Sequence, residues 1–444
     1  MDRKPALALA AWLAVVGCSG QAPQDMKRAA AVRSDPTGDA TSESKSEPET
    51  VPAESPADPS RPSPAGSAPP RARRGVDPAA PAPNPPAEVT SHGPPADELP
   101  PTLKAWETES PPGQIEKGFT RVRILYATDR QRAGDTPDDC YGSERGTGTT
   151  LTPFECGQCD VSVPYKHDPG EIERPSIWKL EFTQNPARHV TLLAVRPLAG
   201  RAFVNLLRED IRQSATQSAF LFVHGFNVEF AEAARRTAQM KYDLGFDGAA
   251  VMYTWPAPKN YVECEGNAVW TRPHLVEFLA QYLQETGAQR VHLIAHSMGT
   301  RVLSDALSEL GQTRGGKSPR YNQIILAAPD IDAAIFRQQI APRIVNAAER
   351  ISIYASSEDV ALLASKKAHH YVRLGEGGQY LSVFPEYPKI EVLDASGVDK
   401  SLLGHSYYGD SPTILRDLRM VLSGVAADRR GVVARNSYFL FFQK

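Results

Sequence analysis

The pentapeptide Ala295-His-Ser-Met-Gly299 could hold a serine hydroxyl in position for nucleophilic attack. An apolar run, 290–294, precedes it, and a segment with helical spacing, 300–307, follows it. A serine at a sharp strand-to-helix turn needs small neighbours, because the two backbones nearly touch there, and this is the layout of a nucleophile elbow. Alanine replaces the usual first glycine, which is a tolerable departure. The pattern predicts Ser297 as a nucleophile.

A serine hydroxyl attacks only when a neighbouring base accepts its proton and a third group orients that base. After a nucleophile elbow, the acid and then the histidine follow in the chain. Asp359 follows the second predicted strand after the turn, and His405 lies in the loop after the last one. Because the carboxyl ends of parallel strands meet at one edge of a sheet, these loops should converge. We predict Asp359 as the acid and His405 as the base, with activity falling below about pH 6–7 as the base is protonated.

Other acidic and histidine side chains compete for these two roles. Asp330 and Asp332 follow the first strand after the turn, where some hydrolases take their acid, although capping or loop bracing would also account for them. His369 and His370 lie near a helix end, where a solvated or dipole-stabilising position is expected. His296 is next to the nucleophile but should project away from the turn, so we interpret it as structural.

An oxyanion hole needs two preorganised backbone N–H groups. One is expected from Met298, the residue after the nucleophile. The other should come from a loop after an earlier strand, and Val223-His-Gly-Phe-Asn227 fits, because the glycine lets the backbone turn. We predict Phe226 as the second N–H donor and His224 as a brace of its loop.

The elements that must position these residues alternate between strand and helix from residue 219 onward. Such alternation predicts an α/β fold with a mostly parallel central sheet and helices on both faces. Three strands (121–127, 160–163 and 190–195) and a helix (202–214) are predicted before it. The later strands are 219–223, 249–253, 291–295, 323–328, 350–355 and 389–393, and the later helices are 229–244, 272–286, 300–310, 333–349, 360–370 and 412–422.

Several motifs together resemble the bacterial α/β-hydrolase family of largely unknown function that is typed by HGFN and AHSMG, within the esterase and lipase superfamily. They are Tyr126-Ala-Thr-Asp-Arg130, Phe222-Val-His-Gly-Phe-Asn227, Tyr253-Thr-Trp-Pro256, Ala295-His-Ser-Met-Gly299, Ala328-Pro-Asp330 and Gly404-His-Ser-Tyr-Tyr408. The resemblance implies the α/β-hydrolase fold and a serine hydrolase with the roles assigned above, and it implies no cofactor or metal. It supplies no substrate. Ala257 stands where the family pattern has serine after Trp-Pro.

The short connection from Asp332 to Ile351 leaves room for one helix and therefore predicts a minimal cap. An open site without a large lid favours a carboxylesterase acting on short or medium acyl esters. A peptidase or amidase would use the same triad. A non-catalytic envelope binding module on a hydrolase scaffold is the alternative of a different class.

The N-terminus has the features of a lipoprotein signal peptide, residues 1–17. Arg3 and Lys4 are followed by an apolar run, 6–16, that is too short to span a bilayer. Val15-Val-Gly-Cys18 resembles a bacterial lipobox, and Ser19 follows the cysteine. We therefore expect lipidation of Cys18 and an outer-membrane lipoprotein that faces the periplasm or the surface. An ordinary secretory signal is the alternative.

Residues 18–117 are predicted to be a disordered tether, and residues 118–444 to be the hydrolase domain. No aromatic residue occurs from 20 to 105, and 20 of the chain's 38 prolines lie from Pro36 to Pro112. Such a composition cannot bury enough apolar surface to offset the entropy of ordering. A flexible tether of this length would span roughly 50–60 Å.

Composition adds two further expectations. The net charge of −3 gives no indication of nucleic-acid binding, so a small-molecule ester and the membrane are the expected partners. The four cysteines besides Cys18 are Cys140, Cys156, Cys159 and Cys264. An even number of cysteines in an exported protein favours disulfides over a metal site.

Overall fold

The structure, a computed structural model, describes residues 113–148, 153–176, 181–283, 286–313, 321–398 and 405–441. The predicted signal peptide, Cys18 and residues 18–112 of the predicted tether lie outside these residues. The described chain begins with strand β1 (Gln114–Glu116), which pairs antiparallel with β2 (Phe119–Thr128). The predicted domain boundary at 118 therefore falls inside a hairpin, because a three-residue edge strand has too short a pattern to recognise.

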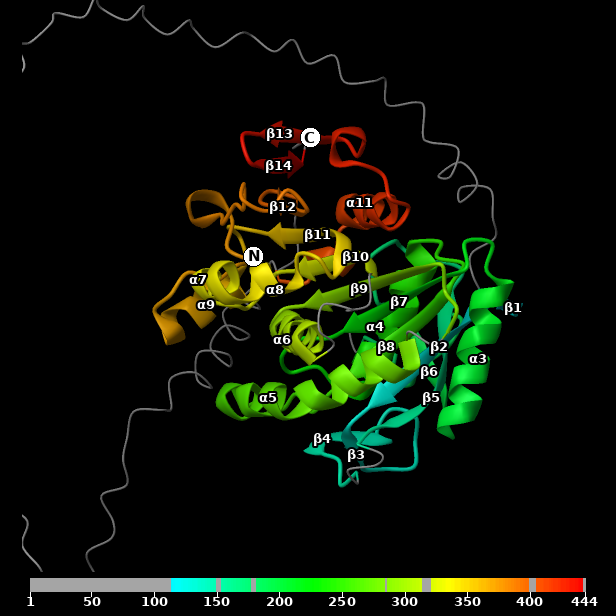
Figure 1. Ribbon diagram of the computed structural model, residues 1–444. Helices are drawn as coiled ribbons and strands as arrows, with labels where there is room; N and C mark the ends of the chain where they lie inside the picture. The colour runs from blue at the N-terminus through cyan, green and yellow to red at the C-terminus, as the bar shows by residue number, and fades with distance from the viewer. Residues whose placement is uncertain are drawn as a thin grey trace, which may run out of the picture. The chain divides into compact units, whose positions relative to one another are not determined.

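One large sheet runs through the described part of the chain, in the order β13-β14-β12-β11-β10-β9-β7-β8-β2-β5-β6 (Figure 1). Neighbouring strands pair in parallel along the central part of this order, from β2 to β14 by way of β8, β7, β9, β10, β11 and β12. The pairing is antiparallel between β2 and β5, between β5 and β6, and between β13 and β14. The strands not yet bounded are β5 (Glu155–Pro164), β6 (Thr191–Leu198), β7 (Ser218–Val223), β8 (Ala249–Thr254), β9 (Arg290–His296), β10 (Tyr321–Ala327), β11 (Ala348–Ala355), β12 (Ile390–Asp394), β13 (Val432–Arg435) and β14 (Tyr438–Phe441).

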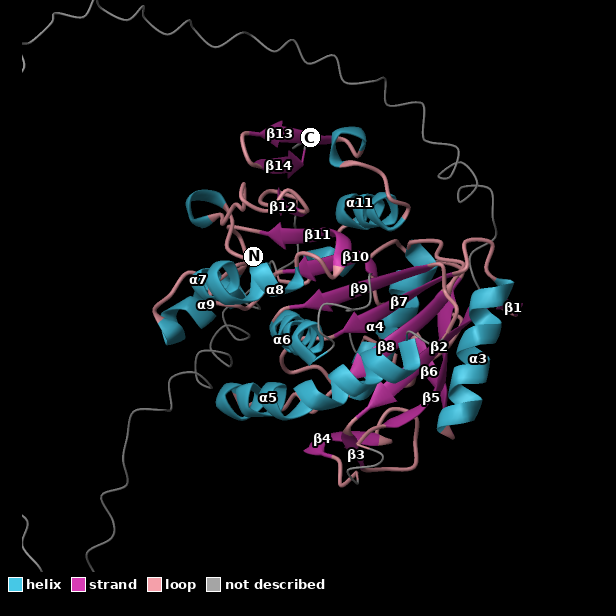
Figure 2. Cartoon of the chain, viewed as in Figure 1, coloured by secondary structure: helices cyan, strands magenta, loops and turns pink. Residues whose placement is uncertain are grey.

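Helices cover both faces of this sheet (Figure 2). Helices α3, α5 and α6 bury apolar residues in one core cluster, and α4 and α11 bury theirs in the other. Within the described ranges, no helix is long and apolar enough to cross a bilayer. The α-helices are α3 (Gly200–Gln213), α4 (Phe230–Asp243), α5 (Tyr261–Phe278), α6 (Met298–Thr313), α7 (Ala333–Ile335), α8 (Ala341–Ile344), α9 (Val360–His369), α10 (Tyr407–Asp410) and α11 (Pro412–Leu422).

The register of the central strands brings their carboxyl ends to one edge. Val223 at the end of β7 pairs with Ala295 of β9, and Ala327 at the end of β10 pairs with both His296 and Tyr354. Every residue of β7 is buried, as expected for an apolar run with a helix layer on each face. The turns after β7, β9, β10 and β11 therefore begin close together, which confirms the fold class predicted from the alternating pattern.

Several elements differ from the prediction. Helix α5 begins at Tyr261 rather than at 272, because the side chain of Asn260 caps it and Pro273 is accommodated inside it. The predicted helix 333–349 is divided into α7, a π-helical segment (Phe336–Ile340) and α8. Two hairpins have no counterpart in the prediction: β13–β14, and the pair β3 (Arg130–Arg132) with β4 (Tyr141–Arg145).

The expectation of disulfides is wrong, since all four described cysteines are free thiols: Cys140, Cys156, Cys159 and Cys264. Cys156 and Cys159 lie three positions apart on β5, so their side chains leave opposite faces of the sheet. The first joins the core cluster of α5, and the second joins the cluster of α4. The same arrangement leaves this cysteine pair unable to share one metal ion.

A histidine whose side chain is buried between two carboxylates connects the loop after β5 to the end of α4. The Nδ1 of His167 lies 2.9 Å from Glu173 Oε1, and its Nε2 lies 2.8 Å from Asp243 Oδ1. Burial alone would lower the pKa of His167, but the hydrogen bonds and charges of Asp243 and Glu173 outweigh it and raise the pKa to about 9. The histidine is therefore a cation at neutral pH.

This cluster predicts a pH-dependent contribution to stability. Because the pKa of His167 is higher in the folded than in the unfolded protein, its protonation stabilises the fold by at most about 3 kcal/mol. This stabilisation is fully present below the unfolded-state pKa of about 6.5 and is lost as the pH rises through the folded-state pKa of about 9. Denaturant titrations give the unfolding free energies of the wild type and of His167→Gln, and the difference between the two should therefore become smaller from pH 6 to pH 10. A pH-independent difference for His167→Gln would contradict this account.

Candidate active site

The turn between β9 and α6 has the geometry of a nucleophile elbow. Ser297 has a φ of +53°, a left-handed conformation that costs energy for a residue with a Cβ. Its N–H donates to the Ala327 carbonyl over 3.0 Å, which ties the turn to the next strand. A Cβ on Gly299 would lie 2.2 Å from the His224 carbonyl oxygen, so only glycine fits there. Ala295 is fully buried, and its methyl group is accommodated in the core.

The structure brings the three predicted triad residues together from three separate loops. His405 Nε2 lies 2.8 Å from Ser297 Oγ. On the other side of the ring, His405 Nδ1 lies 2.9 and 2.8 Å from the two carboxylate oxygens of Asp359. This chain of hydrogen bonds can accept a proton from the serine and can stabilise the resulting imidazolium.

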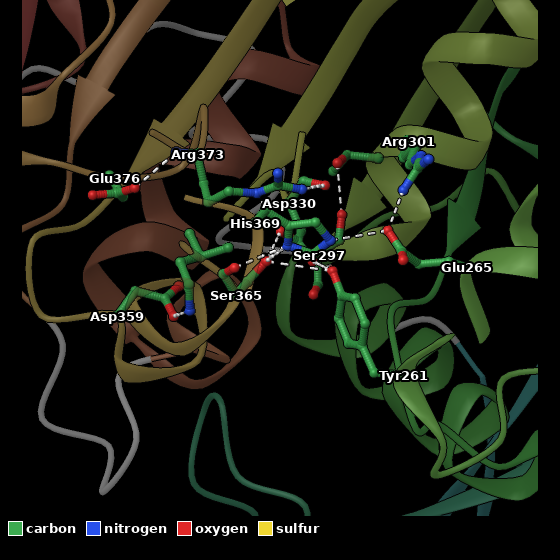
Figure 3. Close-up of polar contacts among 12 residues, drawn as sticks. Tyr261, Glu265, Ser297, Arg301, Asp330, Asp359, Ser365, His369, Arg373 and Glu376 are labelled. Atoms are coloured by element: carbon green, nitrogen blue, oxygen red, sulfur yellow. Dashed lines mark hydrogen bonds and ion pairs between the residues drawn. The ribbon is translucent and has the colours of Figure 1, made fainter. Parts of the chain in front are cut away.

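The end of β11 and the start of α9 position the acid. Asp359 is the N-cap of α9, and its Oδ1 accepts a hydrogen bond from the Leu362 N–H at 2.9 Å (Figure 3). Burial raises the pKa of Asp359 above its usual range, although the charge and hydrogen bond of His405 and the Leu362 N–H act in the opposite direction. The carboxylate therefore relies on His405 and the helix N-terminus to stay ionised.

The alternative acids have other partners. Figure 3 shows Asp330 beside Ser365, Tyr261 and Arg373, whose side chains donate to its carboxylate at 2.7 Å each. The Arg373 guanidinium and these hydroxyls outweigh burial and hold the pKa of Asp330 below its usual range. Asp332 caps α7 by accepting from two backbone N–H groups at 2.8 and 3.0 Å. Arg373 was not predicted, because a single arginine in a loop carries no pattern.

The remaining histidines have structural contacts. The buried His296 places its Nε2 2.8 Å from the backbone carbonyl of His405 and stacks on Tyr408, so it braces the loop of the base. His369, in the last turn of α9, contacts the Ser365 carbonyl at 2.9 Å and lies 3.3 Å from a carboxylate oxygen of Glu265.

The loop after β7 packs directly against the nucleophile. A Cβ on Gly225 would lie 2.7 Å from the Ser297 Cβ, which explains the glycine before Phe226. The N–H of Met298 is at the start of α6, where backbone donors lack helical acceptors. Among the described residues, neither this N–H nor that of Phe226 has a hydrogen-bond acceptor. Both groups are thus available beside Ser297, where an oxyanion would form.

A pocket of about 430 Å³ opens beside this loop at the same edge of the sheet. Gly225, His296 and Ser406 line the side toward the triad, and the apolar Phe222 and Tyr408 also contribute. The charged lining residues are Arg174, Glu229, Glu232, Arg236 and Lys259. Ser297, Asp359 and His405 are not among the residues that line this pocket, although the lining includes their sequence neighbours His296 and Ser406.

Comparison with known families agrees with this geometry. A family model described as "Alpha/beta hydrolase of unknown function (DUF900)" matches residues 200–423, half of the 444-residue chain. The chain belongs to this family. The α/β-hydrolase family membership expected from the sequence motifs is thus confirmed, and the matched range includes Ser297, Asp359 and His405. No curated protein matches the sequence of this DUF900 member.

Solved structures with similarity to this DUF900 protein include a lipase and an esterase/lipase. Lipase B of Aspergillus fumigatus is 13% identical, with 58% of this chain and 63% of the lipase covered and a TM-score of 0.31. An esterase/lipase from an uncultured bacterium is 12% identical, with 74% and 92% covered and a TM-score of 0.27. This chain therefore spans less than two thirds of the fungal lipase.

Proposed function

We propose that this protein is a serine hydrolase, a carboxylesterase that acts on short or medium acyl esters through an acyl-enzyme. The observation that carries the proposal is the continuous hydrogen-bonded chain from Ser297 Oγ through His405 to Asp359, with distances of 2.8 to 2.9 Å. A strained serine, a buried acid and two available N–H groups at one point serve no evident packing purpose.

The geometry supports a two-step reaction. As Ser297 Oγ bonds to the ester carbonyl carbon, His405 Nε2 accepts its proton, and the N–H groups of Phe226 and Met298 stabilise the oxyanion. The bond to the alcohol oxygen then breaks, and His405 returns the proton to that oxygen. Water attacks the acyl-enzyme by the same steps, which releases the carboxylic acid and regenerates the serine.

The small connection between β10 and β11 supports an open site for short or medium acyl groups. The connection between β10 and β11 contains only short helical segments, so we expect no large lid over the nucleophile. We expect the highest kcat/KM among p-nitrophenyl esters at acyl chains of about two to eight carbons, without a rise in rate when the substrate forms micelles. A preference for long acyl chains with activation at a lipid interface would contradict this assignment. Matched anilides in the same panel test amidase activity.

We also propose that the protein is a lipoprotein of the cell envelope. The proposal rests on the lipobox-like residues that end at Cys18 and on the apolar run before them. Replacing Cys18 with alanine should shift the protein out of the membrane fraction in an expressing bacterium. Unchanged membrane association of the variant would contradict lipidation.

A further inference from the structure

Behind the loop that carries Phe226 lies a buried guanidinium. Arg130, at the end of the Tyr126–Arg130 motif, is only 3% exposed. Its Nε donates to the Thr254 hydroxyl over 2.8 Å, and its Nη1 donates to the Gly142 carbonyl over 2.9 Å. Its Nη2 donates to the Val228 carbonyl over 2.6 Å and lies 3.2 Å from His224 Nε2. Arg130 thus contacts both ends of the 224–228 loop.

The partners of Arg130 are neutral. Among the described residues, no carboxylate lies within ion-pair distance of Arg130, and its hydrogen-bond partners are hydroxyl, carbonyl and imidazole groups. Burial lowers the pKa of Arg130 to about 10, and the charges of Asp129 and Glu229 act in the opposite direction. The side chain is therefore still a cation at neutral pH. A buried cation whose hydrogen-bond partners are all neutral is costly, so its retention calls for an explanation beyond packing.

The contacts of His224 define how its ring is protonated. Three donors converge on Nε2: Arg130 Nη2 at 3.2 Å, the Thr254 hydroxyl at 3.0 Å and the Trp255 N–H at 3.1 Å. This nitrogen must therefore be the acceptor, which places the ring proton on Nδ1. Burial and the neighbouring Arg130 lower the pKa of His224 well below its usual range, so the ring is neutral.

The proton on His224 Nδ1 is donated to the Gly225 carbonyl over 2.9 Å. That carbonyl belongs to the same planar peptide as the N–H of Phe226, and the two groups point in opposite directions. Holding the carbonyl therefore aims the N–H. Hydrogen bonds in a chain also polarise one another, so the Phe226 N–H becomes a better donor.

We propose that Arg130 is a positioning residue for the oxyanion hole, which acts through His224 to orient and polarise the Gly225–Phe226 peptide. This inference rests on the proposed function, because it assigns a purpose to that peptide only if an oxyanion forms beside it. The guanidinium supplies fixed positive charge behind the loop, and its bond to the Val228 carbonyl prevents the loop from turning away. Both effects act on the charged transition state more than on the neutral ester.

The test compares Arg130→Met and Arg130→Lys with wild type. The matched control is Arg132→Met, two residues along the same strand, where the arginine is exposed and pairs with Glu155. For each protein, kcat and KM are measured with a short-chain ester. The inhibition constant is measured with a trifluoromethyl ketone, whose carbonyl carbon adds Ser297 Oγ to give a stable oxyanion with no leaving group.

Arg130→Met should lower kcat by about 10- to 100-fold and raise the inhibition constant of the ketone by a similar factor, while KM changes by less than about threefold. Arg130→Lys keeps the charge but has fewer donors, so its values should fall between those of Arg130→Met and wild type. Arg132→Met should match wild type. If Arg130→Met does not fold, as judged by its thermal transition, Arg130→Lys still tests the selective loss of ketone affinity.

Equal ketone affinity in wild type and in a folded Arg130 variant would overturn the positioning role and leave the proposed function intact. A parallel loss of ester and ketone binding, with KM rising as much as the inhibition constant, would show that Arg130 only supports the structure. A wild-type protein that neither hydrolyses esters nor binds the ketone would overturn the proposed function itself, and this inference with it.

Discussion

Replacing Ser297 with alanine should lower kcat by about 10⁴- to 10⁶-fold. Ser297 supplies the attacking oxygen in the proposed reaction, since its Oγ lies 2.8 Å from His405 Nε2. What activity remains should come from water attack assisted by the oxyanion hole. The fold should persist, because the small alanine side chain adds no atoms to the turn, and KM should change little.

Steady-state kinetics with a p-nitrophenyl ester measure this loss. Ser304→Ala is a matched control on α6, because Ser304 is fully buried and its hydroxyl has no hydrogen-bond partner among the described residues. That variant should keep wild-type kcat. A Ser297→Ala protein that stays within about tenfold of wild type would remove the basis of the mechanism.

Replacing Asp359 with asparagine should have the second largest effect, a fall in kcat of about 10⁴-fold. Both carboxylate oxygens lie within 2.9 Å of His405 Nδ1, so the acid holds the ring with its proton on that nitrogen. An asparagine amide can instead donate to Nδ1, which favours the tautomer that presents an N–H to the serine. His405 could then no longer accept the serine proton.

The comparison with Asp330→Asn separates catalysis from stability. Asp330 is the alternative acid from the sequence, and in the structure it forms a buried ion pair with Arg373. Breaking a buried pair leaves an uncompensated charge and should cost about 3–5 kcal/mol of unfolding free energy. We expect Asp330→Asn to unfold earlier in denaturant but to retain far more kcat than Asp359→Asn. The reverse ranking in kcat would reassign the acid.

The parts of the fold that were predictable are those where local pattern and burial agree. Strands β7 and β8 are apolar runs buried throughout, and the elbow sequence needs small residues for a steric reason that the structure shows at Gly299. The order of strands along the chain then places the candidate acid and base at one edge. None of these steps required knowledge of distant contacts.

The parts that were missed depend on contacts between distant residues. The β13–β14 hairpin joins the sheet because β14 pairs in parallel with β12. The contacts of Arg130 with His224 and Val228 lie 94 and 98 residues apart in the chain, and no local pattern reports such pairs. The cysteine prediction failed because an even number of cysteines in the sequence does not show whether any two thiols meet in the folded chain, and all four described cysteines are free.

A fluorophosphonate forms a stable bond only with a serine that has lost its proton to a base, so labelling by this reagent reports whether Ser297 is an activated nucleophile. Intact-mass and peptide mass spectrometry should find one adduct per chain in the wild-type protein, on the peptide that contains Ser297, and none in Ser297→Ala or heat-unfolded protein. Absence of an adduct on folded wild-type protein across neutral and mildly alkaline pH, or an adduct on a different residue, would contradict the account.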